Sequence, residues 1–107
     1  SVNSLAMICW KLINKCSLID KHPSIFHWRN SGAISWYDFA NAIVEIAYKN
    51  KLINKKATID PISTEDYPLP AERPKFSVLD TSSTIDFLEV ENIYWRSELE
   101  KILKSFY

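Results

Sequence analysis

The chain has 107 residues, with 13 basic and 13 acidic side chains and therefore no formal net charge. This length suits one small domain with a modest core. The balanced charge argues against a general nucleic-acid binder, which usually carries an excess of basic residues. Hydrophobic residues make up 47% of the sequence, so the chain is expected to fold. No apolar run approaches the ~20 residues that cross a bilayer, so no membrane partner is expected.

The cysteines, histidines and glycine narrow the chemistry. Cys9 and Cys16 would lie about 10 Å apart along one helix, too far for a disulfide. Reduced cysteines and an N-terminal stretch without a basic signal-peptide region predict a cytoplasmic protein. Phosphate-binding loops need several glycines, and this chain has only Gly32. His22 and His27 have no second cluster of metal ligands around them, so no metal site is expected.

The first elements follow from apolar periodicity. Residues 5–16 have helical spacing, with Ser4 as the expected N-cap. The expected apolar stripe of this helix comprises Leu5, Ile8, Cys9, Leu12, Ile13 and Cys16. The aromatic run 24–29 is bounded by turn residues, which predicts a short buried strand. A turn is expected at 30–32.

The clearest helix is expected over residues 35–49. Ser35 would cap its N-terminus, and Asp38 supplies an acidic first turn. The predicted buried stripe comprises Trp36, Phe39, Ala40, Ile43, Val44 and Ala47. Residues 57–62 favour a strand, which Pro61 confines to the edge or the end of a sheet.

The remaining elements complete a mixed fold. Residues 75–79 predict a second short extended piece, and Asp80 or Thr81 could cap a short helix that ends at Leu88. A last amphipathic helix is expected to run to the C-terminus, with Trp95, Leu99, Ile102, Leu103 and Phe106 on its apolar face. The chain is therefore predicted to be α+β, a small mixed domain of three to four helices with short strands.

The proline-rich stretch 67–80 holds three of the five prolines, at Pro68, Pro70 and Pro74. Each proline stiffens the backbone, and Pro74 pushes Arg73 toward an extended conformation. A guanidinium presented from a stiff segment suits bidentate recognition of a carboxylate or a phosphate. The alternative is a proline-rich connector on which Arg73 is merely solvated.

The sequence by itself shows no catalytic apparatus. No tyrosine is followed by a lysine four positions later, the spacing that would place an ammonium one helical turn from a phenol. Glu65 and Asp66 are adjacent, so in an extended segment they point to opposite faces. No Ser-His-Asp arrangement can be identified from the order of the residues. The chain therefore shows binding features without catalytic residues.

Three segments, 30–43, 63–88 and 94–103, together resemble the C-terminal part of the dTDP-4-dehydrorhamnose reductases. The enzymes of this family are extended short-chain dehydrogenases/reductases. The most specific part is P-A-x-R-P-x-x-S-x-L-D at 70–80, supported by the Trp-Arg pair at 95–96. The resemblance covers nearly the whole chain. Ser4 stands where the family often has Asp, and both residue types cap helices well.

The resemblance implies that residues 1–107 are the sugar-nucleotide-binding part of a larger two-domain α/β (Rossmann-type) reductase. The N-terminal NAD(P)-binding domain, with the glycine-rich loop and the catalytic Tyr and Lys, would be absent from this chain. The full enzyme would reduce dTDP-6-deoxy-L-lyxo-4-hexulose to dTDP-L-rhamnose with NADPH or NADH, and this part alone would bind no cofactor. The strand at 24–29 would add to the sheet of the missing domain, and left unpaired it would favour a homodimer.

Four residues are expected to bind the dTDP-sugar. Arg73 would pair with the diphosphate, Tyr67 and Trp36 would line the pocket, and Ser77 would form a hydrogen bond near the ligand. Core packing is the alternative for both aromatics, especially for Trp36 on the predicted buried stripe. Two other functions stay open: a non-catalytic regulatory subunit like the beta subunit of methionine adenosyltransferase, and an interaction module that presents residues 68–74 as a polyproline-type ligand.

Overall fold

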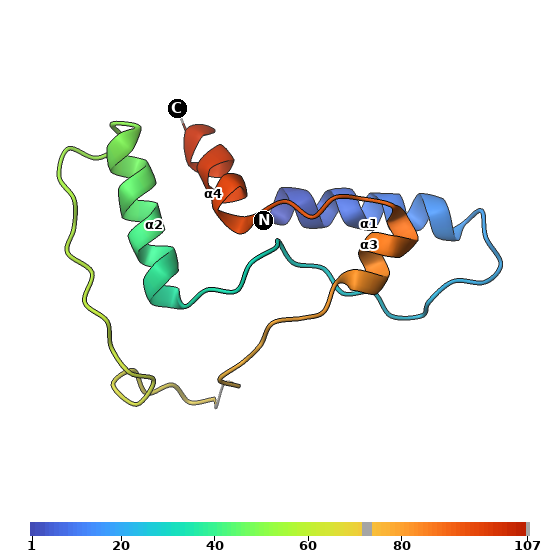
Figure 1. Ribbon diagram of the computed structural model, residues 1–107, viewed down its shortest axis with the longest axis horizontal. Helices are drawn as coiled ribbons and strands as arrows, with labels where there is room; N and C mark the ends of the chain where they lie inside the picture. Colours follow the sequence, from blue (N-terminus) through green and yellow to red (C-terminus); the bar gives the residue numbers. More distant parts are fainter. Residues whose placement is uncertain (72–73, 107) are drawn as a thin grey trace. The chain divides into compact units, whose positions relative to one another are not determined.

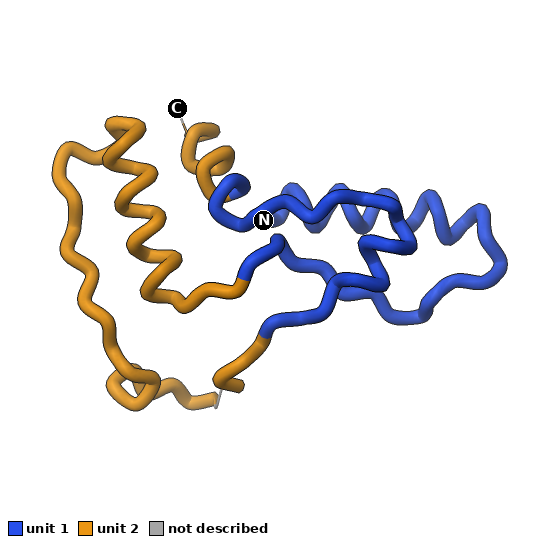
Figure 2. Tube along the Cα trace, in the orientation of Figure 1, with its two compact units in different colours: residues 1–32, 78–98 blue, residues 33–77, 99–107 orange. Residues whose placement is uncertain are grey.

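The computed structural model describes residues 1–71 and 74–106. Four helices form among these residues, namely α1 (Val2–Cys16), α2 (Trp36–Lys49), α3 (Ser82–Leu88) and α4 (Trp95–Lys104) (Figure 1). The chain divides into two compact units (Figure 2). Unit 1 comprises residues 1–32 and 78–98, and unit 2 comprises residues 33–77 and 99–107. The first turn of α4 therefore belongs to unit 1 and the remainder of this helix to unit 2.

The predicted strands are not confirmed. Over residues 1–71 and 74–106, the only strand-like pairing is an isolated parallel bridge between Ser31 and Tyr94. The segments 24–29, 57–62 and 75–79 contain no assigned strand. A strand requires a neighbouring backbone to accept and donate its hydrogen bonds, and extended conformation alone does not supply one. The prediction of three to four helices is thus confirmed, whereas the short strands of an α+β domain are not found among the described residues.

Helix α1 begins earlier than predicted. Ser1 is its N-cap and accepts a hydrogen bond from the backbone N–H of Ser4 at 3.1 Å, so the expectation that Ser4 would cap is wrong. Ser4 is instead buried in the first turn, where its hydroxyl donates to the Ser1 carbonyl at 3.1 Å. The apolar periodicity extends one turn back from Leu5 to Val2, which the predicted range 5–16 left out.

The buried side of α1 is not its predicted stripe. Of that stripe only Ile8 is buried, while Leu5, Cys9 and Ile13 are exposed. Helix α1 packs against α3, where Thr84 and Leu88 are also buried. Both helices lie in unit 1 (Figure 2). The apolar stripe is wider than the contact with α3, so most of it is left uncovered.

Lys15 ties the C-terminal end of α1 to the end of α3. Its Nζ lies 5.2 Å from the centroid of the Phe87 ring and 3.7 Å from Glu89 Oε2. The Glu89 side chain is largely exposed, so the ion pair itself contributes little. The Lys15 ammonium over the Phe87 ring adds a cation–π contact between the two helices.

The segment 24–31 runs through unit 1 and is held by side chains. Phe26 and Trp28 are partly buried while Ile25 and His27 are exposed, the alternation of a strand with one covered face. The Phe26 ring lies 5.2 Å from the Phe87 ring. The His27 backbone N–H donates to Thr84 Oγ1 at 3.2 Å. These contacts keep the segment extended without a sheet.

In unit 2, helix α2 begins as predicted. Ser35 Oγ accepts from the Asp38 N–H, and an Asp38 carboxylate oxygen accepts from the Ser35 N–H, which is a complete capping box. The buried residues of α2 are Ala42, Ile46 and Ala47, and Phe39, Ala40, Ile43 and Val44 are partly buried. The predicted stripe is wrong at its first member, because Trp36 is 78% exposed. As the first residue of the helix, it lies one turn ahead of the buried side chains.

Helix α3 agrees with the prediction, and α4 differs from it at its C-terminal end. Asp80 Oδ1 accepts from the Ser82 N–H at 2.9 Å, just before α3, and Thr81 is the N-cap. Helix α4 ends at Lys104 and does not reach the C-terminus. Ser105 Oγ donates to the Ile102 carbonyl at 2.7 Å, and this contact closes the last turn. Phe106 therefore lies outside the helix and is exposed.

Gly32 lies against the start of α4; no turn is assigned to residues 30–32, where one was predicted, and Ser31 instead forms the bridge with Tyr94. Gly32 has φ +98°, a conformation that L side chains rarely adopt. A Cβ on this residue would lie 2.5 Å from Trp95 Cδ1 and 2.8 Å from Tyr94 Cε2. The glycine allows Ser31 to donate to the Ile93 carbonyl and to accept from the Trp95 N–H, both at 3.0 Å.

We expect Gly32→Ala to lower the free energy of unfolding by about 2–4 kcal/mol, because backbone strain and overlap with two aromatic rings add. Urea unfolding followed by tryptophan fluorescence measures the change. Ala33→Ser, at the exposed neighbouring position, is the control and should leave the midpoint unchanged. A Gly32→Ala protein as stable as the control would show that Gly32 does not hold α4 in place.

Candidate functional site

Three of the four predicted ligand-binding residues belong to unit 2 and are exposed: Trp36, Tyr67 and Ser77. The fourth, Arg73, lies outside the described residues. Within the described part of unit 2, no hydrogen bond or ring contact joins Trp36, Tyr67 and Ser77 to one another. The structure therefore presents these side chains to solvent separately and does not assemble them into a closed pocket.

Trp36 is oriented by the capping box at the start of α2. Ser35 and Asp38 fix the first turn, and Trp36 lies between them in the sequence. Its indole packs edge-on against Phe39, with ring centroids 6.0 Å apart and planes at 79°. One edge of the indole is thereby supported, while most of its surface stays accessible. An exposed and pre-oriented aromatic ring of this kind is suited to stacking on a sugar or a base.

Asp38 occupies the N-terminal end of α2. Hydrogen bonds from the Ser35 hydroxyl (2.7 Å) and the Ser35 backbone N–H (3.0 Å) hold the pKa of the Asp38 carboxyl below its ordinary value. The carboxylate also complements the positive end of the helix dipole. With a negative side chain already there, this helix end is a poor place for a second anion such as a phosphate.

Tyr67 follows a turn built in the same way. Ser63 donates to Asp66 Oδ2 from its hydroxyl at 2.8 Å and from its backbone N–H at 3.1 Å. These bonds lower the pKa of the Asp66 carboxyl. The Tyr67 N–H donates to the Thr64 carbonyl at 3.3 Å, which closes the turn. The phenol ring itself is 63% exposed.

Other exposed apolar side chains accompany Tyr67 along the same segment. Ile62, Leu69 and Phe76 are all exposed, and sequence reasoning did not single them out. They alternate with prolines and polar residues and follow neither a helical nor a strand period, so periodicity gave no signal. Their composition, apolar residues within a stiffened segment, was the only available sign of a binding surface.

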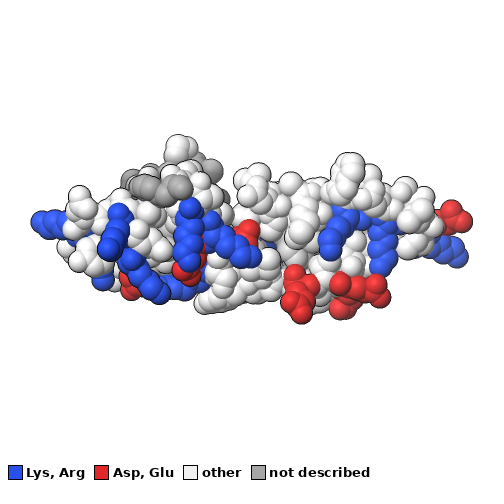
Figure 3. All heavy atoms as spheres, turned by 90° about the horizontal axis from the view of Figure 1, so that it is seen from above, with Lys and Arg blue, Asp and Glu red and all other residues white. Residues whose placement is uncertain are grey.

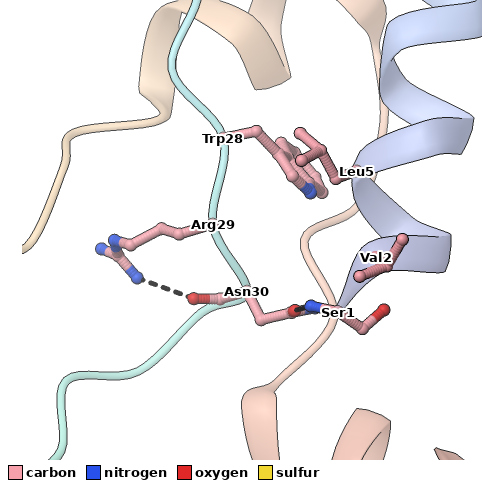
Figure 4. Close-up of a pocket in the computed structure, with 6 residues that line it drawn as sticks. All are labelled: Ser1, Val2, Leu5, Trp28, Arg29 and Asn30. Atoms are coloured by element: carbon pink, nitrogen blue, oxygen red, sulfur yellow. Dashed lines mark hydrogen bonds between the residues drawn. The ribbon is translucent and has the colours of Figure 1, made fainter.

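A shallow hollow of about 370 Å³ lies in unit 1, away from the predicted residues in the sequence (Figure 4). Val2, Leu5 and Trp28 form its apolar wall, and Ser1, Arg29 and Asn30 form its polar rim. In Figure 4 the Trp28 indole lies beside the Leu5 side chain. The sequence did not predict this hollow, because its residues come from the start of α1 and from the segment 24–31, which are far apart in the chain.

The Arg29 guanidinium on this rim donates its hydrogen bonds to backbone carbonyl groups. Its Nε donates to the Leu79 carbonyl at 2.7 Å, and one terminal nitrogen donates to the carbonyls of Asn30 at 3.0 Å and Gly32 at 3.3 Å. Three carbonyl acceptors satisfy much of the donor capacity of the guanidinium. Arg29 therefore braces the backbone before unit 2 and is not a free anion receptor.

The described residues contain neither a candidate metal site nor a membrane-spanning helix. No group of three or more His, Cys, Asp or Glu side chains gathers in a way that could hold a metal ion, as far as residues 1–71 and 74–106 show. None of the helices in that same part is long and apolar enough to cross a membrane. Figure 3 shows acidic and basic side chains on the same face among uncharged ones.

Acidification should weaken the capped turns. Because the folded-state pKa of Asp38 is depressed, its contribution to stability is present above the unfolded value of about 3.9 and is lost as the pH falls through the folded value. We expect the midpoint of urea unfolding to fall between pH 5 and pH 2. Asp38→Asn should be less stable at pH 7 and lose less on acidification.

Asp86→Asn is the matched control, since Asp86 is exposed within α3 and has no serine cap partner. It should keep the pH dependence of the unchanged protein. If Asp38→Asn and Asp86→Asn show the same pH dependence, the Ser35–Asp38 box does not stabilise the folded state.

Comparison with known proteins identifies relatives of this sequence. A family model described as RmlD substrate binding domain matches residues 1–107. The chain is 33% identical over 78 residues to a dTDP-4-dehydrorhamnose reductase of Aggregatibacter actinomycetemcomitans, covering 73% of this chain and 26% of that protein. It is 33% identical over 88 residues to the spore coat polysaccharide biosynthesis protein SpsK of Bacillus subtilis, covering 82% of this chain and 29% of that protein.

A dTDP-4-dehydrorhamnose reductase of Burkholderia thailandensis is 35% identical over 74 residues, covering 67% of this chain and 25% of that protein. The chain thus spans about a quarter of the length of the curated relatives that it matches. No solved structure gives a significant match.

Proposed function

The chain belongs to the family of RmlD substrate binding domains, and from this premise we propose that it binds the dTDP-sugar of a longer dTDP-4-dehydrorhamnose reductase. The observation that carries the proposal is the family match over all 107 residues. Two relatives bear the name of that enzyme, and a third is named for polysaccharide biosynthesis. The reaction would be the reduction of dTDP-6-deoxy-L-lyxo-4-hexulose to dTDP-L-rhamnose.

The redox chemistry would come from the part of the relatives that this chain does not match. The chain has one glycine and no Tyr-x-x-x-Lys pair, so it offers neither a phosphate-binding loop for a dinucleotide nor a paired proton donor. An N-terminal domain would therefore hold NADPH or NADH and deliver the hydride. The present chain would place the 4-keto sugar in reach of that cofactor.

The aromatic side chains of unit 2 would contact the sugar nucleotide. Trp36 and Tyr67 are exposed, and each is placed by a Ser–Asp hydrogen-bonded turn, so little conformational entropy is lost when a ligand stacks on them. Ser77 is exposed and can donate or accept a hydrogen bond. Arg73, next to Pro74, would supply the charge for the diphosphate.

Arg73→Ala tests the diphosphate contact. The protein to use is a chimera in which this chain replaces the matching quarter of the Aggregatibacter reductase, titrated with dTDP-L-rhamnose by calorimetry. Loss of a charge-assisted bidentate contact should weaken binding about tenfold to a hundredfold, or about 1.5–3 kcal/mol. Lys75→Ala, which removes an exposed cation two residues further along the chain, is the control and should change affinity little. Equal affinities for the two variants would refute the role of Arg73.

Trp36→Ala tests the aromatic contact in the same chimera. We expect dTDP-L-rhamnose to bind about three- to tenfold more weakly, since an aromatic stacking partner contributes about 0.5–1.5 kcal/mol beyond its buried area. Tyr48→Ala removes an exposed aromatic ring from the other end of α2 and is the control. If Trp36→Ala binds as tightly as Tyr48→Ala, the indole does not contact the ligand.

A chimera that binds no sugar nucleotide at all would overturn the proposed function and direct attention to the other interpretations. The regulatory-subunit interpretation then predicts binding to a partner enzyme. The polyproline-ligand interpretation predicts that the segment 63–75 is cleaved readily by proteases, because a packed substrate loop would resist cleavage.

A further inference from the structure

The C-terminal end of α2 and the residues that follow it are strongly basic. Four of the eight residues at 49–56 are lysines, and no acidic residue lies between Glu45 and Asp60. The chain as a whole has no formal net charge, so this local excess of positive charge does not follow from its composition. All four lysines are exposed and belong to unit 2. We call them the lysine patch, which comprises Lys49, Lys51, Lys55 and Lys56.

The end of α2 and one ring contact bring the patch together. The Leu52 N–H donates to the Ala47 carbonyl at 2.8 Å, so the chain reverses its direction where the helix ends. The Lys51 N–H donates to the Tyr48 carbonyl at 3.0 Å within the same reversal. Further along the chain, the Lys56 ammonium lies 5.1 Å from the centroid of the Tyr48 ring. This contact returns Lys56 to the last turn of α2, where the patch begins.

Lys51 has a backbone conformation that a lysine does not favour. Its φ is +59°, in the left-handed region, directly after the C-cap residue Asn50. Helices often place glycine at this position, because glycine has no Cβ to clash there. A disfavoured residue type at a strained backbone position points to a role for its side chain.

The ammonium groups of the patch are not neutralised by the described part of the chain. Within residues 1–71 and 74–106, no hydrogen bond or ion pair joins the four lysines to a carboxylate. The patch contains no arginine, whose planar fork suits partners of fixed bidentate geometry. Lysine presents a point charge on a flexible stem. Such an array fits a partner whose negative charges are spread over a surface and can rearrange.

We propose that the lysine patch binds the anionic headgroups of a lipid bilayer, an interaction that goes beyond the proposed function. Clusters of four or more basic residues are attracted to membranes with negatively charged lipids, and each lysine near the surface strengthens binding about fivefold. None of the helices in residues 1–71 and 74–106 could span a bilayer, so the contact is peripheral. The attraction acts over about one Debye length, roughly 8–10 Å at physiological salt.

Two other anionic partners fit the patch less well. Proteins that bind nucleic acid without sequence preference stack bases on aromatic rings, and the Tyr48 ring already lies beneath Lys56. A protein partner would find its strongest contacts on exposed aromatic or apolar anchors. The apolar side chains between the lysines, Leu52 and Ile53, are partly buried instead.

The patch also leaves the proposed ligand contacts accessible. Trp36 is the first residue of α2 and Lys49 the last, so they lie about 20 Å apart along the helix axis. A chain held on a membrane through the lysine patch keeps the Trp36 end of this helix open to a sugar nucleotide. Membrane binding and sugar-nucleotide binding can therefore be measured, and can fail, independently.

Co-sedimentation of the 107-residue chain with lipid vesicles tests the proposal. Vesicles of phosphatidylglycerol and phosphatidylcholine in equal amounts supply the anionic surface, and vesicles of phosphatidylcholine alone are the neutral control. At low salt we expect the anionic vesicles to bind at least about tenfold more strongly, and high salt should remove the difference because it screens the surface charge.

A matched pair of double variants locates the contact. Lys51→Gln combined with Lys55→Gln should weaken binding to the anionic vesicles about twentyfold to thirtyfold. Lys11→Gln combined with Lys21→Gln removes the same charge from exposed positions of unit 1 and should change binding little. Circular dichroism shows whether each variant keeps its helices.

Lys51→Gly separates the charge of this residue from its backbone strain. Glycine relieves the left-handed conformation, so the midpoint of urea unfolding should rise. Loss of one positive charge should at the same time weaken binding to the anionic vesicles about fivefold. A lysine with a purely structural role would not change stability and vesicle binding in opposite directions.

Four results would overturn the proposal. The chain could fail to bind the anionic vesicles at low salt. Equal binding to anionic and neutral vesicles would assign the contact to apolar side chains. Equal losses in the two double variants would show that net charge acts and the patch does not. Lysine-dependent binding to poly-L-glutamate or to single-stranded DNA, without binding to the anionic vesicles, would assign the patch to an acidic protein or to a nucleic acid.

Discussion

Unit 1 depends on the hydrogen bond by which Thr84 of α3 holds the backbone N–H of His27. Thr84 is fully buried, so this polar contact is made without competition from water. Around it the Phe26 ring packs on Phe87, and the Trp28 indole donates to Ser4 Oγ at 3.4 Å. Side chains from two helices thus take the place of a sheet in keeping the segment 24–31 extended. At its end, Ser31 joins the start of α4 beside Gly32.

The two units leave different apolar side chains exposed. In unit 1, the pairing of α1 with α3 covers only part of the apolar surface of α1, and Val2, Leu5 and Ile13 stay exposed. In unit 2, α2 has its own buried residues and presents Trp36 at its first turn. The exposed aromatic side chains that we propose as contacts of the sugar nucleotide, Trp36 and Tyr67, both belong to unit 2.

The two candidate aromatic contacts, Trp36 and Tyr67, each lie beside the same kind of hydrogen-bonded Ser–Asp turn. In both places a serine donates to an aspartate three residues later, and in return its hydroxyl accepts from the backbone N–H of that aspartate. Trp36 lies inside the first turn of this kind and Tyr67 directly after the second. Exposed aromatic rings on loops would ordinarily lose much freedom on binding. A short hydrogen-bonded turn beneath each ring reduces that loss, at the cost of two carboxylates that must stay ionised.

The sequence determined the local features of this protein. The N-cap at Ser35 with Asp38 in the first turn and the helix that ends at Leu88 depend on neighbouring residues alone, and both were predicted. The family could also be identified, because the motif at 70–80 is local.

The sequence did not determine which side chains are buried or which segments pair as strands. Periodicity shows which side of a helix is apolar, but not whether another element covers it. Trp36 was therefore expected to be buried and lies exposed, and Leu5 and Ile13 of the apolar stripe of α1 are exposed as well. Strands at 24–29 and 57–62 were expected and did not form, since an extended preference does not supply a partner backbone. Only the tertiary structure decided these points, because burial and strand pairing depend on residues that are distant in the sequence.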